Sequence, residues 1–284
     1  MAKHALVVLA HPEIKSFNGG LAQVAEDTLK DMGWTVERSN LTQTGFDPVE
    51  RAAHYPNIKN TERFDSQTEQ RHAAETNAIP DDVTAELEKI ERADFLFIQF
   101  PVWWFAAPAI LKGWFDRSLL YGRVYTSKQR YDAGKFKGKR AMVSATTGGP
   151  ESTLAHNGRN GDIELLLWPT NMTLAYVGFS VLPPFTSFEV GGAIAYSGED
   201  ESIARRERDK RTLADRLRAM DTQGIDMEVL SINPTWYGME RELAAKVVQV
   251  QNEKLAELCA AQPERFAPMA SLALQFPDLA VQQL

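Results

Sequence analysis

Three short loops carry residue types that could bind a planar, anionic cofactor. The first loop, residues 11–18, follows an apolar run and precedes a helical pattern that begins near Asn18. A loop that leads into a helix N-terminus offers free backbone N–H groups and the positive end of the helix dipole, which favours a phosphate. His11, Ser16, Phe17 and Asn18 lie in this loop. Ser16 and Asn18 supply side-chain donors to a phosphate, and a helix-capping role alone is the simpler alternative.

The second and third loops supply aromatic side chains and glycines. In the second, Val102 is followed by the three aromatic residues Trp103, Trp104 and Phe105. Adjacent aromatic side chains are costly to expose, so they either form a core cluster beneath the loop or a platform for a planar ring. The third loop consists of Thr146, Thr147, Gly148 and Gly149. Its paired glycines permit a ligand to approach the backbone closely and permit unusual backbone dihedrals.

The intervening sequence predicts the elements that would bring these loops together. Predicted strands, largely apolar in all but the second, occupy residues 5–10, 34–39, 95–100, 141–145 and 177–182. Helical patterns separate most of them, over residues 18–32, 83–92, 108–119 and 162–168. This alternation predicts an α/β protein with a doubly wound, five-stranded parallel sheet, in which ligands bind at the carboxyl ends of the strands. The polar stretch 45–80 shows little periodicity and predicts a long surface excursion.

The composition changes near residue 199, and the rest of the chain predicts a C-terminal β/α extension. Residues 199–218 form a dense run of both charges, which is typical of a solvated helix. A strand over 227–232, a helix over 240–261, a strand over 268–274 and a helix from 277 follow. We therefore divide the chain into two domains, residues 1–205 and 206–284.

Composition and charge exclude several classes of protein. The 284 residues are 44% hydrophobic and 24% charged, which is ample for a sizeable core, and a net charge of −7 argues against nucleic-acid binding. The single cysteine, Cys259, cannot form an intrachain disulfide and fits a reducing cytoplasm. The most hydrophobic window, residues 95–111, contains Gln99, Pro101 and Pro108 and is too short for membrane insertion. We expect a soluble, cytoplasmic protein.

The ordered set of motifs resembles the NAD(P)H:quinone oxidoreductases, which are flavodoxin-like proteins that bind FAD. The resemblance is carried by LVVLAHPEIKSFN (residues 6–18), FPVWWFAAPAILKGW (100–114), residues 125–134 and TTGG (146–149). It implies that the adenine diphosphate part of FAD contacts His11, Ser16, Phe17 and Asn18. It also implies that the isoalloxazine ring contacts residues 102–105 and 146–149; FMN is the less favoured cofactor.

The same resemblance implies a mechanism and a substrate pocket. NAD(P)H and a quinone use one pocket in turn, and a hydride passes to the flavin and then to the quinone in a ping-pong cycle. The residues that match this pocket are Tyr125, Thr126, Ser127 and Asn160. The backbone N–H groups of Gly148 and Gly149 are expected to stabilise negative charge on the reduced flavin, so we assign a catalytic role to both glycines and to Asn160. The resemblance also implies a homodimer with the site at the subunit boundary.

Some residues depart from the family pattern. Leu154 and Asn160 stand where animal members have a tyrosine and a histidine that are proposed to relay charge, and Leu154 cannot donate a proton. His156 is two residues away from the relay position, and Ser127 replaces a tyrosine, which should widen the pocket. Two alternatives therefore stay open: a regulatory flavoprotein subunit of a potassium-efflux system, and an FMN-dependent nitro- or azo-reductase.

The C-terminal segment resembles a different family. Residues 216–234 and 251–266 are similar to an early part of the metal-dependent amidohydrolase and decarboxylase barrels. No histidine follows His156, and the other histidines lack metal-ligand spacing, so we predict no metal site. We interpret the chain as a fusion, natural or engineered, joined within residues 205–224. The tail is then a passenger segment, or alternatively an interface or a cover for the active site.

Overall fold

The computed structural model describes residues 3–190, 199–222, 228–231, 239–260 and 266–282. Contacts between Cα atoms divide the chain into two units, residues 1–218 and 219–284. Helix α7 (Glu199–Thr222) contains both this division and the domain boundary at residue 205 that we expected from the sequence.

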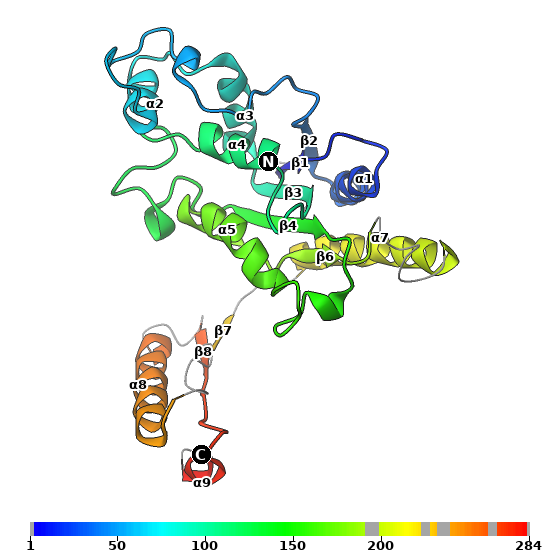
Figure 1. The fold of residues 1–284 in the computed structure, drawn as a ribbon, viewed down its shortest axis with the longest axis vertical. Coiled ribbons are helices and arrows are strands. Elements are labelled where there is room, and N and C mark those ends of the chain that lie inside the picture. The colour runs from blue at the N-terminus through cyan, green and yellow to red at the C-terminus, as the bar shows by residue number, and fades with distance from the viewer. Residues whose placement is uncertain (1–2, 191–198, 223–227, 232–238, 261–265, 283–284) are drawn as a thin grey trace. The chain divides into compact units, whose positions relative to one another are not determined.

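A parallel sheet organises the first unit (Figure 1). The strand order is β2-β1-β3-β4-β5, with β2 at Thr35–Asn40, β1 at His4–Leu9, β3 at Phe95–Pro101, β4 at Arg140–Thr146 and β5 at Ser180–Val181. Strand β3 is buried throughout, and so is β1 apart from its first residue, as expected for parallel strands covered on both faces. The predicted α/β class and the parallel sheet are confirmed.

The fifth position of the sheet is shared by two short strands. Strand β4 pairs with β5 at its start and with the additional strand β6 (Phe185–Ser187) at its end. Pro183 and Pro184 lie between β5 and β6, and proline has no N–H to donate to a strand ladder. The single strand expected over 177–182 was therefore too long at its start, where Val177 caps helix α5, and β6 was missed.

Helices cover both faces of this sheet. One face packs against α3, α4 and α5, which span Asp81–Arg92, Ala109–Ser118 and Ile163–Tyr176. Helix α1 (Phe17–Asp31) lies against the other face, and α7 runs beside it: a Cβ placed on Gly20 of α1 would lie 3.7 Å from Cε of Lys210 of α7. Helix α7 is also tied to the sheet edge, because the guanidinium of Arg216 donates to the carbonyls of Pro183 and Pro184, both at 3.1 Å.

Helix α2 (Ser66–Glu75) was missed in the polar stretch 45–80. Its N-cap, Asp65, accepts from the N–H of Thr68 at 2.9 Å, and the helix buries Glu69 and Gln70 beside only one apolar residue. A helix held by polar side chains has no apolar stripe, so hydrophobic periodicity cannot reveal it. Short 3-10 turns occur at Ala52–His54, Tyr131–Ala133 and Glu151–Thr153.

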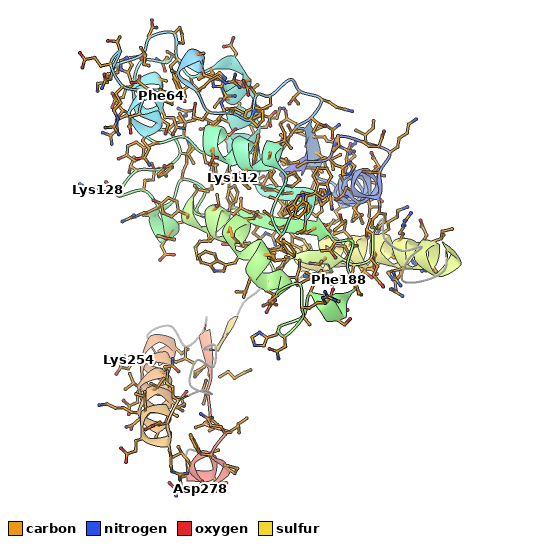
Figure 2. The ribbon with its side chains drawn as sticks, viewed as in Figure 1. Phe64, Lys112, Lys128, Phe188, Lys254 and Asp278 are labelled. Carbon is orange, nitrogen blue, oxygen red and sulfur yellow. The ribbon has the colours of Figure 1, made fainter. Side chains whose placement is uncertain are left out.

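The second unit is a small β-α-β-α arrangement. Strands β7 and β8 pair in parallel, α8 connects them and α9 follows; they span Glu228–Ser231, Phe266–Met269, Arg241–Ala260 and Pro277–Gln282. Asp278 of α9 is labelled in Figure 2, and its Oδ1 accepts from Nη1 of Arg241 at 2.9 Å. The order of elements was predicted, but the second strand begins and ends earlier than residues 268–274. No helix in the described ranges of either unit is long and apolar enough to cross a membrane.

Two adjacent glycines of α1 should respond to substitution with opposite signs. A Cβ on Gly19 would lie 1.8 Å from the carbonyl oxygen of Ile14, whereas the nearest atom to a Cβ on Gly20 is a flexible lysine carbon. We expect Gly19→Ala to lower the free energy of unfolding by about 1–3 kcal/mol through overpacking. Gly20→Ala should raise it by about 0.4–1 kcal/mol, because the unfolded chain loses freedom. Urea unfolding measures both, and equal effects would contradict this account.

Candidate cofactor site

The loop after β1 presents hydrogen-bond donors at the start of α1. Ser16 caps the helix, since its Oγ accepts from the N–H of Gly19 at 3.2 Å. The first-turn N–H groups of Phe17 and Asn18 have no acceptor within the described ranges. Nδ1 of His11 lies 3.0 Å from both the N–H and the carbonyl oxygen of Glu13, which holds the imidazole against the backbone of this loop. Capping and anion binding are therefore compatible in this loop.

A buried polar cluster ties this loop to the neighbouring strands. The amide of Asn18 donates from Nδ2 to Thr146 Oγ1 at 3.0 Å, and its Oδ1 accepts from Gln99 Nε2 at 2.9 Å. All three side chains are buried. The cluster joins α1, β3 and β4 at the carboxyl edge of the sheet, and it accounts for the one polar residue that interrupts the apolar run of β3.

The aromatic loop after β3 is a tight, strained turn. Trp103 and Ala106 exchange two backbone hydrogen bonds, of 2.9 and 3.1 Å, and the two residues between them have positive φ, 50° at Trp104 and 62° at Phe105. Glycine or asparagine normally occupies such positions, and a non-glycine residue there costs of order 1–3 kcal/mol. Trp103, Trp104 and Phe105 are 46%, 94% and 56% exposed. The alternative of a core cluster beneath the loop was therefore wrong.

The loop after β4 offers backbone donors. The N–H groups of Gly148 and Gly149 have no protein acceptor in the described part of the chain. Neither glycine has a positive φ, so the unusual dihedrals considered from the sequence are absent. Close approach matters instead: a Cβ on Gly149 would lie 3.1 Å from Thr153 Oγ1 and 3.5 Å from Asn160 Nδ2.

These three loops surround one cavity of about 580 Å³. The predicted cofactor residues that line it are His11, Ser16, Phe17, Asn18, Val102, Trp103, Trp104, Thr146, Thr147 and Gly148. Phe105 and Gly149 were also predicted to contact the cofactor but lie next to lining residues rather than among them. Pro101, Val190 and Arg206 complete the lining, and none of the three was among the predicted site residues. No sequence signal separates Arg206 from its many charged neighbours in α7.

The predicted substrate residues lie elsewhere. Tyr125 lines a separate hollow of about 430 Å³, with Gln67, Asp116 and Tyr176 among its neighbours. Burial raises the pKa of the Tyr125 phenol, so the phenol is protonated at neutral pH. Thr126 and Ser127 follow Tyr125 in the chain and line neither this hollow nor the cavity between the loops.

The residues at the relay positions pack beside the glycine loop. Asn160 donates from Nδ2 to Thr153 Oγ1 at 3.1 Å, and Leu154 is buried. His156 is exposed and lies 3.3 Å from Asp162. None of these three residues lines the cavity. No group of three or more His, Cys, Asp or Glu side chains in the described ranges could hold a metal ion.

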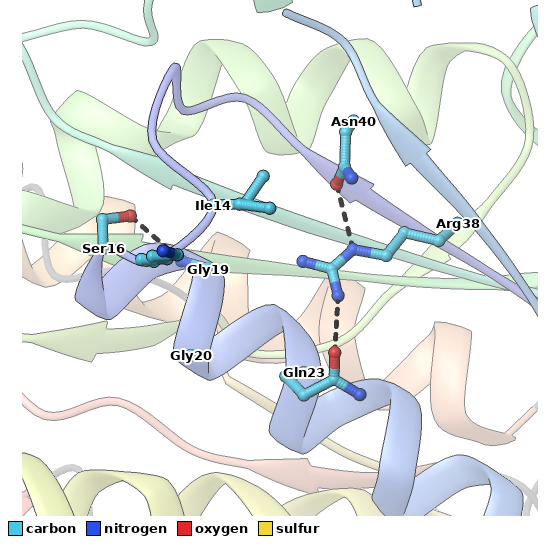
Figure 3. Close-up of a pocket in the computed structure, with 8 residues that line it drawn as sticks. Ile14, Ser16, Gly19, Gly20, Gln23, Arg38 and Asn40 are labelled. Atoms are coloured by element: carbon cyan, nitrogen blue, oxygen red, sulfur yellow. Dashed lines mark hydrogen bonds between the residues drawn. The ribbon is translucent and has the colours of Figure 1, made fainter. Parts of the chain in front are cut away.

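A smaller hollow of about 270 Å³ lies beside Ser16 (Figure 3). Lys15 and Arg38 are its basic lining residues; Arg38 donates to Asn40 and to Gln23, both at 2.9 Å, and lies 3.3 Å from Glu26. The charge of Arg38 is thus compensated by protein groups, in contrast to that of Arg206, whose Nε is buried with no hydrogen-bond partner in the described structure.

A parallel sheet with an anion-binding loop, an aromatic turn and a glycine loop at its carboxyl edge defines a flavodoxin-like protein. The flavodoxin-like fold family matches residues 3–217, and the chain belongs to this family. It is 40% identical over 191 residues to NAD(P)H dehydrogenase (quinone) 1 of Cavia porcellus, covering 66% of this chain and 70% of that protein.

Two further relatives extend the likeness. Ribosyldihydronicotinamide dehydrogenase (quinone) of Mus musculus is 36% identical over 245 residues, covering 84% of this chain and 99% of that protein. The crystal structure of a candidate quinone reductase from Klebsiella pneumoniae superimposes with a TM-score of 0.70 at 28% identity, covering 86% of this chain and 99% of that chain.

Trp104 offers a direct test of the aromatic platform. Its side chain is 94% exposed, so Trp104→Ala should leave the free energy of unfolding nearly unchanged. Loss of stacking, worth about 1–3 kcal/mol per base on an aromatic side chain, should weaken flavin binding about tenfold or more. Fluorescence titration of the apoprotein with flavin measures the dissociation constant. Trp168→Ala on α5 removes another exposed tryptophan side chain, one that does not line this cavity, and is the control. Unchanged affinity in Trp104→Ala would contradict the platform.

Proposed function

We propose that this chain is an NAD(P)H-dependent quinone reductase that works through bound FAD. The observation that carries the proposal is the single cavity in which the anion-binding loop, the aromatic turn and the glycine loop meet. The names of the relatives, which are quinone dehydrogenases at about 40% identity, support the same activity. When bound, a flavin supplies two-electron chemistry that takes a hydride from a nicotinamide and gives it to a quinone.

The end of the cavity beside the start of α1, which we call the anion-binding end, fits a phosphate group. The first-turn N–H groups of Phe17 and Asn18 are available as donors, and the imidazole of His11 lines the same cavity. Arg206 adds a positive charge, and its orphaned, buried Nε would gain the partner that it lacks. These groups would fix the position of the cofactor rather than move a proton.

The same end favours FAD over FMN. The guanidinium carbon of Arg206 lies 6.0 Å from the ring centroid of Phe17, and both side chains line the cavity. An arginine and an aromatic ring beyond the first phosphate suit a second phosphate and an adenine, which FAD has and FMN lacks. FMN-dependent reduction of nitro or azo compounds is the alternative if FMN alone is retained.

The other end of the cavity suits the isoalloxazine ring. Trp103 and Trp104 would bind its faces, while the backbone donors of Gly148 and Gly149 would stabilise negative charge that develops on it. Asn160 packs against Gly149 and would support this loop. Leu154 and Asn160 provide neither a phenol nor an imidazole at the two relay positions, which favours the regulatory flavoprotein as the second candidate.

The quinone pocket requires a second copy of the chain. Tyr125 lies on a hollow that shares no lining residue with the cofactor cavity, so one chain does not bring the two together. We infer a homodimer in which Tyr125, Thr126 and Ser127 of one copy complete the site of the other. The protonated phenol of Tyr125 would donate a hydrogen bond to a quinone oxygen. The cytoplasmic location, the split into domains 1–205 and 206–284 and the barrel-like tail remain predictions from the sequence.

A visible absorption spectrum of the purified protein is the first test. We expect an oxidised-flavin spectrum that bleaches with NADH or NADPH and returns with a quinone, and released FAD on chromatography. Bleaching with slow return in every quinone would support the regulatory alternative. A colourless protein that takes up neither FAD nor FMN would contradict both.

Mixed dimers test the shared site. Trp104→Ala and Tyr125→Ala should each reduce quinone turnover, because each removes a different side of the same site. In a dimer of one chain of each kind, one site carries both changes and the other carries neither. Mixed dimers purified through two different affinity tags should therefore have close to half of the wild-type activity. Mixed dimers no more active than the two single variants would contradict the inferred dimer.

A further inference from the structure

A short segment after β6 is joined by hydrogen bonds to the glycine loop of the cavity. The N–H of Thr147 donates to the carbonyl of Ser187 at 2.9 Å, and the N–H of Val190 donates back to Thr147 at 2.8 Å. The N–H of Glu189 donates to the carbonyl of Gly149 at 3.1 Å. The backbone of residues 187–190 therefore sets where the loop and its free donors lie.

Glu189 holds this segment in an unfavourable conformation. Its φ is 58°, in the left-handed region that glycine adopts without strain and a glutamate does not. The carboxylate lies 2.7 Å from Nη1 of Arg205 on α7, and only 18% and 16% of the two side chains are exposed. Glycine would adopt this backbone conformation without strain, so the interactions of the Glu189 side chain must compensate for the strain.

Helix α7 brings this ion pair next to the anion-binding end of the cavity. Arg205 binds Glu189, and the next residue, Arg206, lines the cavity with its buried, unpartnered Nε. Successive helical residues project about 100° apart, so one turn of α7 reaches two places at once. The helix thus joins the phosphate end of the cavity to the loop that contains Gly148 and Gly149.

We propose that Glu189 and Arg205 form a positioning pair that couples anion binding at Arg206 to the placement of the Thr147–Gly149 loop. The inference rests on the proposed function for the identity of the ligand, a flavin with a phosphate end. Neither member of the pair lines the cavity, so both act through the groups that do. The free N–H groups of Gly148 and Gly149 would donate to the ring of a bound flavin, so the pair would stabilise the more negatively charged reduced form more than the oxidised form.

The experiment compares variants by flavin affinity and by midpoint potential. Glu189→Gln removes the charge, and Glu189→Gly also removes the backbone strain. Both should weaken FAD binding about tenfold, and both should weaken the reduced form a further tenfold, which lowers the two-electron midpoint potential by about 30 mV. Arg205→Lys keeps the positive charge, so this variant should retain most of the wild-type FAD affinity and midpoint potential. Glu207→Gln, an exposed position on the same helix, is the matched control and should change neither.

A double-mutant cycle separates coupling from general loosening. Arg206→Gln should lower the potential in the wild-type chain and have little effect in Glu189→Gln, because the link is already broken. Additive shifts, or a Glu189→Gly variant with wild-type affinity and potential, would overturn the proposal. Failure of the wild-type chain to bind flavin would instead overturn the proposed function. Urea midpoints of the apoproteins identify any variant that fails to fold. If Glu189→Gln fails to fold, Glu189→Gly, which removes the backbone strain, provides the comparison with the wild-type chain.

Discussion

The hydrogen bonds that Asn18 makes with Gln99 and Thr146 are the interaction on which the site depends. The buried amide of Asn18 is satisfied at both Nδ2 and Oδ1 by the other two side chains, so the cluster fixes the segments that carry them. Backbone pairing joins the ends of β3 and β4, and these side-chain hydrogen bonds add a directional link from both strands to the start of α1. The aromatic turn and the glycine loop begin within a few residues of this cluster. Its order is therefore a condition for the shape of the cavity.

The parallel sheet is what allows three distant segments to meet. Strands β1, β3 and β4 are adjacent and run the same way, so their carboxyl ends lie at one edge. Two aromatic residues in left-handed conformations are tolerated in this setting because strand β3, which leads into the turn, is fully buried and holds its start in place. Stability in the sheet thus supports strain at the edge.

The sequence predicts the parts of this molecule that follow from regular patterns. The parallel strands, most helices and ten lining residues of the cavity could be found, because apolar runs mark strands and loops at their ends mark sites. Helix α2 could not be found, because polar side chains hold it in place. Arg206 was also missed: it lies in a run of charge, and only the packing of α7 beside α1 brings it to the cavity. Tyr125 was predicted to lie at the substrate pocket, but in the structure it lines a separate hollow, and no sequence pattern indicates that separation.

The position of Arg206 along the chain has a consequence for biosynthesis. Synthesis starts at the N-terminus and adds about 5–20 residues each second, so the elements up to Gly149 emerge before α7 does. The central strands of the nascent sheet can pair before Arg206, the cation at the anion-binding end of the cavity, has been synthesised. Retention of a cofactor is thereby ordered after assembly of the sheet. A chain released before α7 would keep the three loops but lack this cation. Such a chain would bind an anionic cofactor less tightly than a chain that includes α7.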